Sequence, residues 1–197
     1  MEKWMSKFPL LVLLLAVCST LFFNAPHFNE LPTHRHAWSQ FDHHAISIGF
    51  VDNGLDFFHP QTNTKILHPW DDEAKKQDFS YITSVDFPIH HYIPAISMKI
   101  WGNTDPIHNR LYTYIYSLIG VLFLYKLSSL LIEHAYLAII PPLFLIFSPV
   151  FSYYQIGILP SIPSLANFII GTYFFVKYTK SNERKQWIIS LIFITLA

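Results

Sequence analysis

Two aspartates combine an acidic side chain with an unusual setting. Asp42 lies in the stretch WSQFDHH, shortly after a strongly apolar N-terminal run, and Asp86 directly precedes Phe87 and Pro88. A carboxylate close to a bilayer is costly unless it is paired, solvated or used in a reaction. The alternatives are structural: Asp42 suits the first turn of a helix, and Asp86 suits an N-cap with Pro88 near the first helical position. Spacing alone leaves both interpretations open.

Histidines and arginines are the other reactive side chains of this region. A zinc site needs three or four converging ligands, usually with a recognisable pair such as i and i+4 on a helix. Neighbouring histidines on a helix point about 100° apart, so the sequence predicts no metal site built from these histidines. A guanidinium suits phosphate recognition, although arginines at a membrane edge commonly extend towards water instead. The residues concerned are His34, His36, His43, His44, His59, His68, His90, His91, Arg35 and Arg110.

The composition indicates the class of protein. Of 197 residues, 52% are hydrophobic, 17% are aromatic and only 13% are charged. Soluble domains contain roughly 25% charged residues, so this chain resembles a membrane protein. The formal net charge is zero, which gives no basic field for nucleic acid. A single cysteine, Cys18, excludes an intramolecular disulfide and a thiolate metal cluster.

Apolar runs predict an all-α polytopic membrane protein with about four complete transmembrane helices and a truncated fifth. A span needs about 20 apolar residues. The first run has no small-x-small cleavage site after it, which favours an uncleaved helix over a removed signal peptide. The last run stops in mid-membrane, so we expect the N-terminal part of a longer transmembrane domain. The predicted spans are 5–23, 107–125, 135–151 and 158–178, with a partial span at 187–197.

Basic residues set the expected orientation. Lys3 and Lys7 precede the first span, Lys126 closes the second, and several lysines and an arginine follow the fourth within 177–185. The positive-inside rule assigns these ends to the cytoplasm, and the helix count agrees. The long first loop, residues 24–106, is then extracytoplasmic.

Two helices are expected in this loop. One begins near Ser39 and ends at Asn53–Gly54, a pair suited to a C-terminal cap. The other covers 87–102, with Phe87, Ile89, Ile93, Ile96 and Ile100 on a broad apolar side and Pro94 as a weak point. Short amphipathic helices between two spans are predicted to lie flat at the membrane interface.

The order of these features resembles the bacterial branch of the GT-C membrane glycosyltransferases. That group includes dolichyl-phosphate-mannose protein mannosyltransferases and the lipid A aminoarabinose transferase. Three positions depart from the usual pattern: Ser39 stands where Arg is usual, Ser161 where an acidic residue is usual, and Asp86 where Glu is commoner. The matching residues are Gln40, Asp42, Asn53–Gly54, Pro60, Asp86–Phe87–Pro88 and Arg110.

The resemblance implies transfer of a sugar from a polyprenyl-phosphate donor to an extracytoplasmic glycan, lipid or protein. Asp42 is then the general base that takes the acceptor's proton. Asp86 could orient that base, contact the acceptor or help to hold a divalent cation, Mg²⁺ or Mn²⁺. Gln40, His43 and Arg110 are candidate substrate-binding residues. The departing phosphate needs positive charge, which Arg110 or a residue C-terminal to this sequence could supply. The implied location is the bacterial inner membrane, with the bilayer as a partner and the active face outside.

Two other classes of protein remain as alternatives. A transporter or lipid-glycan flippase would have charged residues inside the spans and broken helices at the midplane. Pro141–Pro142 does interrupt the third run, but no acidic residue lies mid-span in the four runs. A non-enzymatic membrane assembly protein is the third class.

Overall fold

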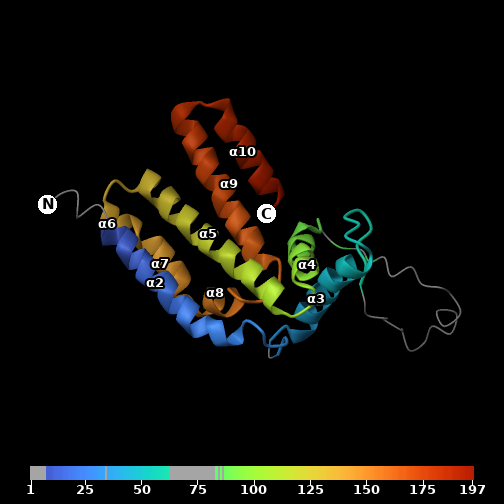
Figure 1. Ribbon diagram of the computed structural model, residues 1–197. Coiled ribbons are helices and arrows are strands. Elements are labelled where there is room, and N and C mark those ends of the chain that lie inside the picture. Colours follow the sequence, from blue (N-terminus) through green and yellow to red (C-terminus); the bar gives the residue numbers. More distant parts are fainter. Residues whose placement is uncertain (1–7, 34, 63–82, 84, 86) are drawn as a thin grey trace, which may run out of the picture. The chain divides into compact units, whose positions relative to one another are not determined.

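The computed structural model describes residues 8–33, 35–62, 83, 85 and 87–197. These residues form helices and connecting segments, and no β-strand occurs among them. They divide into two compact units (Figure 1). Unit 1 contains the chain up to Asn29 and from Arg110 onwards, and unit 2 contains Glu30–Asn109. The all-helical class predicted from the sequence is confirmed for the described residues.

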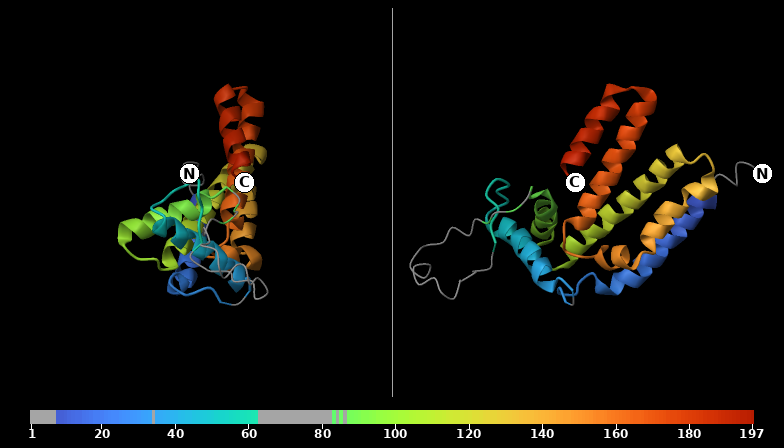
Figure 2. Two further views of the ribbon diagram at one scale, coloured as in Figure 1. Left: turned by 90° about the vertical axis from the view of Figure 1, so that its right-hand side faces the viewer. Right: turned by 180° about the vertical axis from the view of Figure 1, so that it is seen from behind.

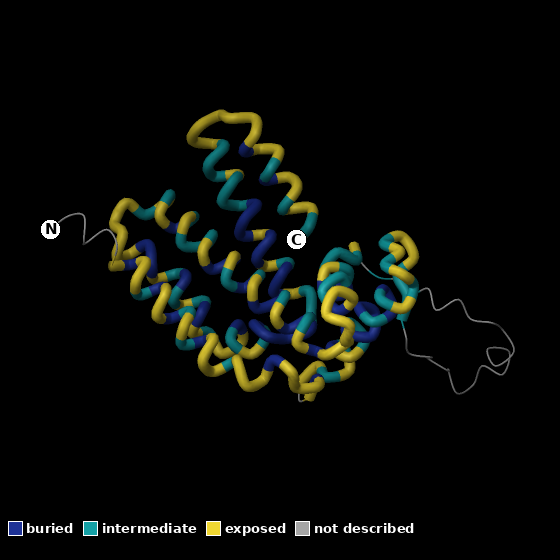
Figure 3. The backbone as a smooth tube through the Cα atoms, in the orientation of Figure 1, coloured by how far each residue is buried: buried dark blue, intermediate teal, exposed yellow. Residues whose placement is uncertain are grey.

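Unit 1 begins with α2 (Phe8–Asn24), which continues into the 3-10 turn η1 (Ala25–His27) at Pro26. Together they are long and apolar enough to cross a membrane. Figure 3 shows most of α2 as exposed or partly exposed, although most of its side chains are apolar. The buried residues Pro9, Leu13, Ala16 and Thr20 form one stripe at i, i+4, i+7 and i+11.

The second helix that meets the criteria for a span in the described part is α5 (Ile107–Leu131). It begins at the residue predicted from the sequence and runs six residues beyond the predicted end at 125. Its first three residues belong to unit 2 and the rest to unit 1.

The segment predicted as the third span, 135–151, is divided into short helices. These are α6 (Ala135–Ala138), α7 (Ile140–Ile146) and α8 (Pro149–Tyr154). Pro141 and Pro142 lie in the first turn of α7, and Pro149 begins α8. Proline fits the first turn of a helix but disrupts the interior of one. A new helix therefore begins just before Pro141 and Pro142, and another begins at Pro149. Whether this segment crosses the membrane stays a prediction.

A helical hairpin completes unit 1. It consists of α9 (Ser161–Ser181) and α10 (Arg184–Thr195), which lie side by side in both views of Figure 2. Gly171 makes this packing possible, because a Cβ there would lie 2.6 Å from Ile194 Cγ1. The Ser190 hydroxyl donates to the Gly171 carbonyl at 2.8 Å. The predicted spans at 158–178 and 187–197 correspond to these helices, and their passage through a membrane likewise stays a prediction.

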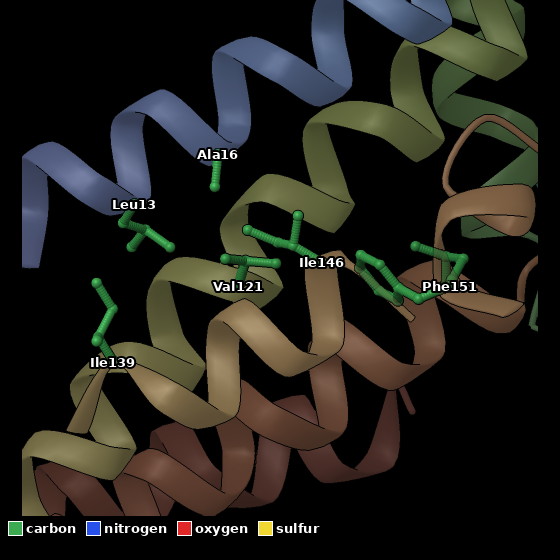
Figure 4. Packing of buried hydrophobic residues seen from close by; sticks show 7 residues of the cluster. Leu13, Ala16, Val121, Ile139, Ile146 and Phe151 are labelled. Carbon is green, nitrogen blue, oxygen red and sulfur yellow. The ribbon is translucent and has the colours of Figure 1, made fainter. Parts of the chain in front are cut away.

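The core of unit 1 lies between α2, α5 and the short helices. Figure 4 shows Leu13 and Ala16 of α2 pointing towards Val121 of α5 and Ile146 of α7. Ile139, Phe151 and Ile162 complete the buried cluster. On another side of α5, Gly120 lies against Ala166 of α9, where an added Cβ would come within 2.9 Å of the alanine methyl group.

Unit 2 is built on α3 (Ala37–Asp52) and α4 (Ile89–Trp101), which pack against each other. Ile46 and Phe50 of α3 and Ala95 of α4 form the core between them. The chain leaves α3 through Gly54, at φ +78°, and leaves α4 through Gly102, at φ +73°. Both positions need the left-handed conformation that glycine adopts without strain, which is why both ends were predictable.

Candidate functional site

The α3 helix carries three of the predicted site residues, Gln40, Asp42 and His43. Its start is set by His36, which adopts a left-handed conformation at φ 57°. Gln40 is buried and its Nε2 donates to the Arg35 carbonyl at 3.3 Å, across the turn that begins the helix. Gln40 therefore stabilises the helix start in this structure, and its predicted contact with substrate remains a prediction.

Asp42 occupies a different side of α3 from Gln40, because two positions along a helix turn the side chain by about 200°. Its side chain is half-buried. Among the described residues, no hydrogen bond or ion pair engages its carboxylate. Asp86, the second predicted acid, lies outside the described residues.

His43 is joined to α4 by a pair of imidazole rings. Its Nδ1 lies 2.6 Å from Nε2 of His91, and the two rings are nearly parallel, with an interplanar angle of 17°. One ring must donate and the other accept, so the bond requires at least one neutral imidazole. His91 is 5% exposed, and its Nδ1 has no hydrogen-bond partner in the described part of the chain. Burial first, and then the nearby His43 and His90, lower the pKa of His91 from 6.5 to about 3.

His44 belongs to a separate series of hydrogen-bonded polar side chains, on the buried side of α3. Its Nδ1 lies 2.9 Å from the Oδ1 of Asn109, in the first turn of α5. The Asn109 Nδ2 donates to the Ser47 hydroxyl at 2.8 Å, and that hydroxyl donates to the His43 carbonyl at 3.3 Å. Because Asn109 uses its amide nitrogen on Ser47, its oxygen accepts, and His44 Nδ1 must carry a proton.

These hydrogen bonds fix α3 against the first turn of α5. Ser47 is fully buried and its hydroxyl proton is committed to a carbonyl, so it is not placed as a nucleophile. A similar link joins α4 to α5: Ser97 Oγ lies 2.6 Å from His108 Nδ1, and His108 Nε2 lies 2.6 Å from Asn103 Oδ1. Histidines in unit 2 thus hold α3, α4 and the first residues of α5, which belong to the same unit, together.

Arg110 follows Asn109 directly and is the first residue of unit 1 on α5. It is 7% exposed, and its Nη1 donates to the Ile156 carbonyl at 2.8 Å. A buried guanidinium carries five donors in a planar fork that matches the oxygens of a phosphate. Arg110, which is predicted to face the departing phosphate, is thus held in this structure by the main-chain oxygen of Ile156.

No group of three histidine, cysteine, aspartate or glutamate side chains among the described residues could hold a metal ion. The predicted divalent cation involves Asp86, which lies outside those residues, so it stays a prediction. The paired histidines contact each other and the helices rather than a common centre.

The sequence did not predict the pairing of His91 with His43 or the role of Asn109. His91 was considered among the histidines that could bind a metal, whereas it is buried and paired with His43. The signal present in the sequence was a His-His pair in each predicted loop helix, at 43–44 and 90–91. Asn109 had no signal beyond its place beside Arg110.

A sequence model of the family described as dolichyl-phosphate-mannose-protein mannosyltransferase matches residues 86–197, more than half of the chain. The match covers α4, α5 and every later helix, and includes Arg110. Gln40, Asp42 and His43 precede the matched residues. No curated protein and no solved structure matches the chain.

Proposed function

Because the chain belongs to the dolichyl-phosphate-mannose-protein mannosyltransferase family, we propose that it transfers a sugar from a polyprenyl-phosphate donor to an acceptor outside the cytoplasm. The family consists of membrane glycosyltransferases, and the two apolar helices α2 and α5 agree with a membrane location. The sugar and the acceptor, a glycan, lipid or protein, are left open by the proposal. The enzyme is proposed to cross the bacterial inner membrane several times and to act on its outer face.

Asp42 is the proposed general base, and the contrast along α3 supports this assignment. Gln40, His44 and Ser47 are buried and engaged in hydrogen bonds that hold the helix in place. Asp42 is half-buried, and none of those bonds uses its carboxylate. A carboxylate carried near the start of a helix that is held in place is what a proton acceptor requires, since the base must reach the acceptor hydroxyl in a fixed direction.

The proposed step forms one bond and breaks one bond at the anomeric carbon of the sugar. The acceptor oxygen bonds to C1 while its proton passes to Asp42, and the bond from C1 to the phosphate oxygen breaks. The polyprenyl phosphate leaves with that electron pair. Arg110 is proposed to stabilise the charge that grows on the leaving phosphate, and Asp86 to assist Asp42, contact the acceptor or hold a divalent cation.

The test replaces Asp42 by Asn, which keeps the size of the side chain and removes its basic oxygen. Release of polyprenyl phosphate from the family's donor, a polyprenyl-phosphate mannose, is measured in membranes that contain the protein. Loss of a general base lowers such a rate by about 10²–10⁴-fold. The matched control is Asp52→Asn, the same change at an exposed position in the last turn of α3. It should keep near wild-type activity.

Two results would contradict the assignment. Asp42→Asn with wild-type release would remove Asp42 from the reaction, and equal loss in Asp52→Asn would point to damage of α3 instead of loss of a base.

A further inference from the structure

Gln155, the residue after α8, is a buried amide that links three parts of unit 1. It is fully buried. Its Nε2 donates to the Ser117 hydroxyl of α5 at 3.0 Å, and its Oε1 accepts from Asn24 Nδ2, at the end of α2, at 3.5 Å. A primary amide in an apolar interior is unfavourable unless its hydrogen bonds are made. These two bonds therefore hold the turn after α8 against α5 and α2.

The main chain of the same turn presents a carbonyl to Arg110. The Gln155 N–H donates to the Phe151 carbonyl at 2.8 Å, and the Gly157 N–H donates to the Tyr154 carbonyl at 2.9 Å. Between them, the Ile156 carbonyl accepts from Arg110 Nη1 at 2.8 Å. The carbonyl that holds the guanidinium thus belongs to the residue next to the anchored Gln155.

On α5, the residues that meet this turn lie on one side of the helix. Arg110, Tyr114 and Ser117 are spaced i, i+4 and i+7, so they form one stripe. Tyr114 lies between the other two, its hydroxyl is 3.2 Å from Thr20 Oγ1 of α2, and its ring packs edge-on against Phe28 with centroids 5.4 Å apart. Ile156 completes this buried group. The guanidinium therefore sits at the end of a stripe whose other members are fixed.

We propose that Gln155 is a positioning residue for Arg110: it fixes the Ile156 carbonyl and thereby aims the guanidinium at the phosphate of the donor. This inference rests on the proposed function only for the role of Arg110. A long, flexible arginine loses less freedom on binding when it is already held in the bound direction. Polar contacts between membrane helices also serve simply to join helices, so the experiment must separate positioning from general stability.

The experiment measures binding of polyprenyl phosphate, the leaving group shared by every donor of this class. The whole protein is placed in nanodiscs of phosphatidylcholine, and the Kd is determined for the wild type, Gln155→Leu, Arg110→Ala and the double variant. Gln155→Leu should weaken binding about tenfold, which corresponds to 1.4 kcal/mol. In the Arg110→Ala background the same change should alter the Kd by less than about twofold, because the group that Gln155 positions is gone.

Asn167→Leu is the matched control for the loss of a buried amide in unit 1. Asn167 is 1% exposed and donates to the Leu196 carbonyl at 2.9 Å, in the α9–α10 hairpin. The variant Asn167→Leu should leave the Kd for polyprenyl phosphate near that of the wild type. Where Gln155→Leu fails to fold, Ser117→Ala is the second variant, because it removes the acceptor of the Gln155 amide by a smaller change. It should weaken binding about threefold, less than the tenfold loss expected of Gln155→Leu. This loss should disappear in the Arg110→Ala background.

Other results overturn the proposal and are distinguishable from failure of the proposed function. Equal losses from Gln155→Leu with and without Arg110, or an equal loss in Asn167→Leu, would make Gln155 a structural residue and leave the glycosyltransferase assignment intact. Wild-type binding by Arg110→Ala would instead remove Arg110 from phosphate recognition, and the positioning role with it. Asp42→Asn should bind polyprenyl phosphate normally while losing transfer.

Discussion

α2 and α4 both expose large apolar side chains, but they do so in different ways. Around α2 the exposed leucines and phenylalanines occupy most of the circumference, and only one stripe, through Leu13 and Ala16, is buried. On α4 the exposed apolar residues Ile93 and Ile100 lie opposite a buried side that contains His91, Ala95 and Met98, and the exposed Trp101 is the last residue of the helix.

The difference indicates two surroundings. A helix that is apolar on its buried and its exposed sides fits a hydrocarbon environment, since there is no polar side for water to solvate. A helix with one exposed apolar side, and with the exposed Lys99 beside it, fits a boundary between an apolar and an aqueous phase. We therefore expect α2 to cross the bilayer and α4 to lie at its surface.

The largest effect is expected from a charge in the middle of α2. Leu15 is 61% exposed. On a helix in water, Leu15→Asp would change stability by no more than about 0.5 kcal/mol, whereas an aspartate at the centre of a membrane helix costs about 2.5–3.5 kcal/mol. We therefore expect much less Leu15→Asp protein in the carbonate-resistant membrane fraction, and an unchanged amount of the control Leu15→Phe. Equal membrane retention of all three proteins would place α2 in a different environment.

A smaller, pH-dependent effect is expected in unit 2. The pKa of His91 in the folded protein, about 3, lies below its ordinary value of 6.5, so the unfolded chain takes up this proton first as the pH falls. The stability is therefore fully present above about pH 6.5 and decreases as the pH falls from 6.5 towards 3. Between pH 7 and 5 the loss should be about 2 kcal/mol. Thermal unfolding of the detergent-solubilised protein at the two pH values measures it.

His91→Phe should remove most of this dependence, because phenylalanine fills the site without titrating. His134→Gln is the control, since His134 is exposed in unit 1, and it should retain the full dependence. A wild-type protein whose unfolding temperature is equal at pH 7 and 5 would show that His91 is not buried as a neutral ring.

The sequence predicted those features that depend on local residue types. Glycine after a helix allows a left-handed turn, so the ends of α3 and α4 followed from Gly54 and Gly102. An unbroken apolar run without proline predicted α5. The prolines at 141 and 142 indicated an interruption of the predicted third span, which is where α6 ends and α7 begins. The break between α7 and α8, at Phe147–Ser148, was not predicted and occurs because Pro149 starts another helix.

Features that depend on partners distant in the chain were not predictable. The apolar stripe of α4 was recognised, but periodicity cannot tell whether protein or lipid covers such a stripe, and α3 packs against the other side. The pairing of His43 with His91 joins residues 48 positions apart, and that of Gln155 with Asn24 joins residues 131 positions apart. Within the candidate site, Asp42 is half-buried and its use as a base stays a prediction, while Asp86 lies outside the described residues.

The smallest effect is expected on the exposed side of α4, where Ile100 is 71% and Trp101 is 70% exposed. Near a bilayer surface an introduced charge costs only about 0–1 kcal/mol, because the side chain can reach water. Ile100→Asp should therefore leave the protein in the membrane but lift this end of α4 away from the lipid.

In a variant that keeps only Trp101 of the five tryptophans, lipid-attached quenchers at a shallow depth should quench the Trp101 fluorescence more than deep ones. Ile100→Asp should weaken the shallow quenching, and Phe58→Asp, at an exposed residue of the turn after α3, should leave it unchanged. Deep quenching of Trp101 would make α4 part of a membrane span, and α2 and α4 would then share one environment.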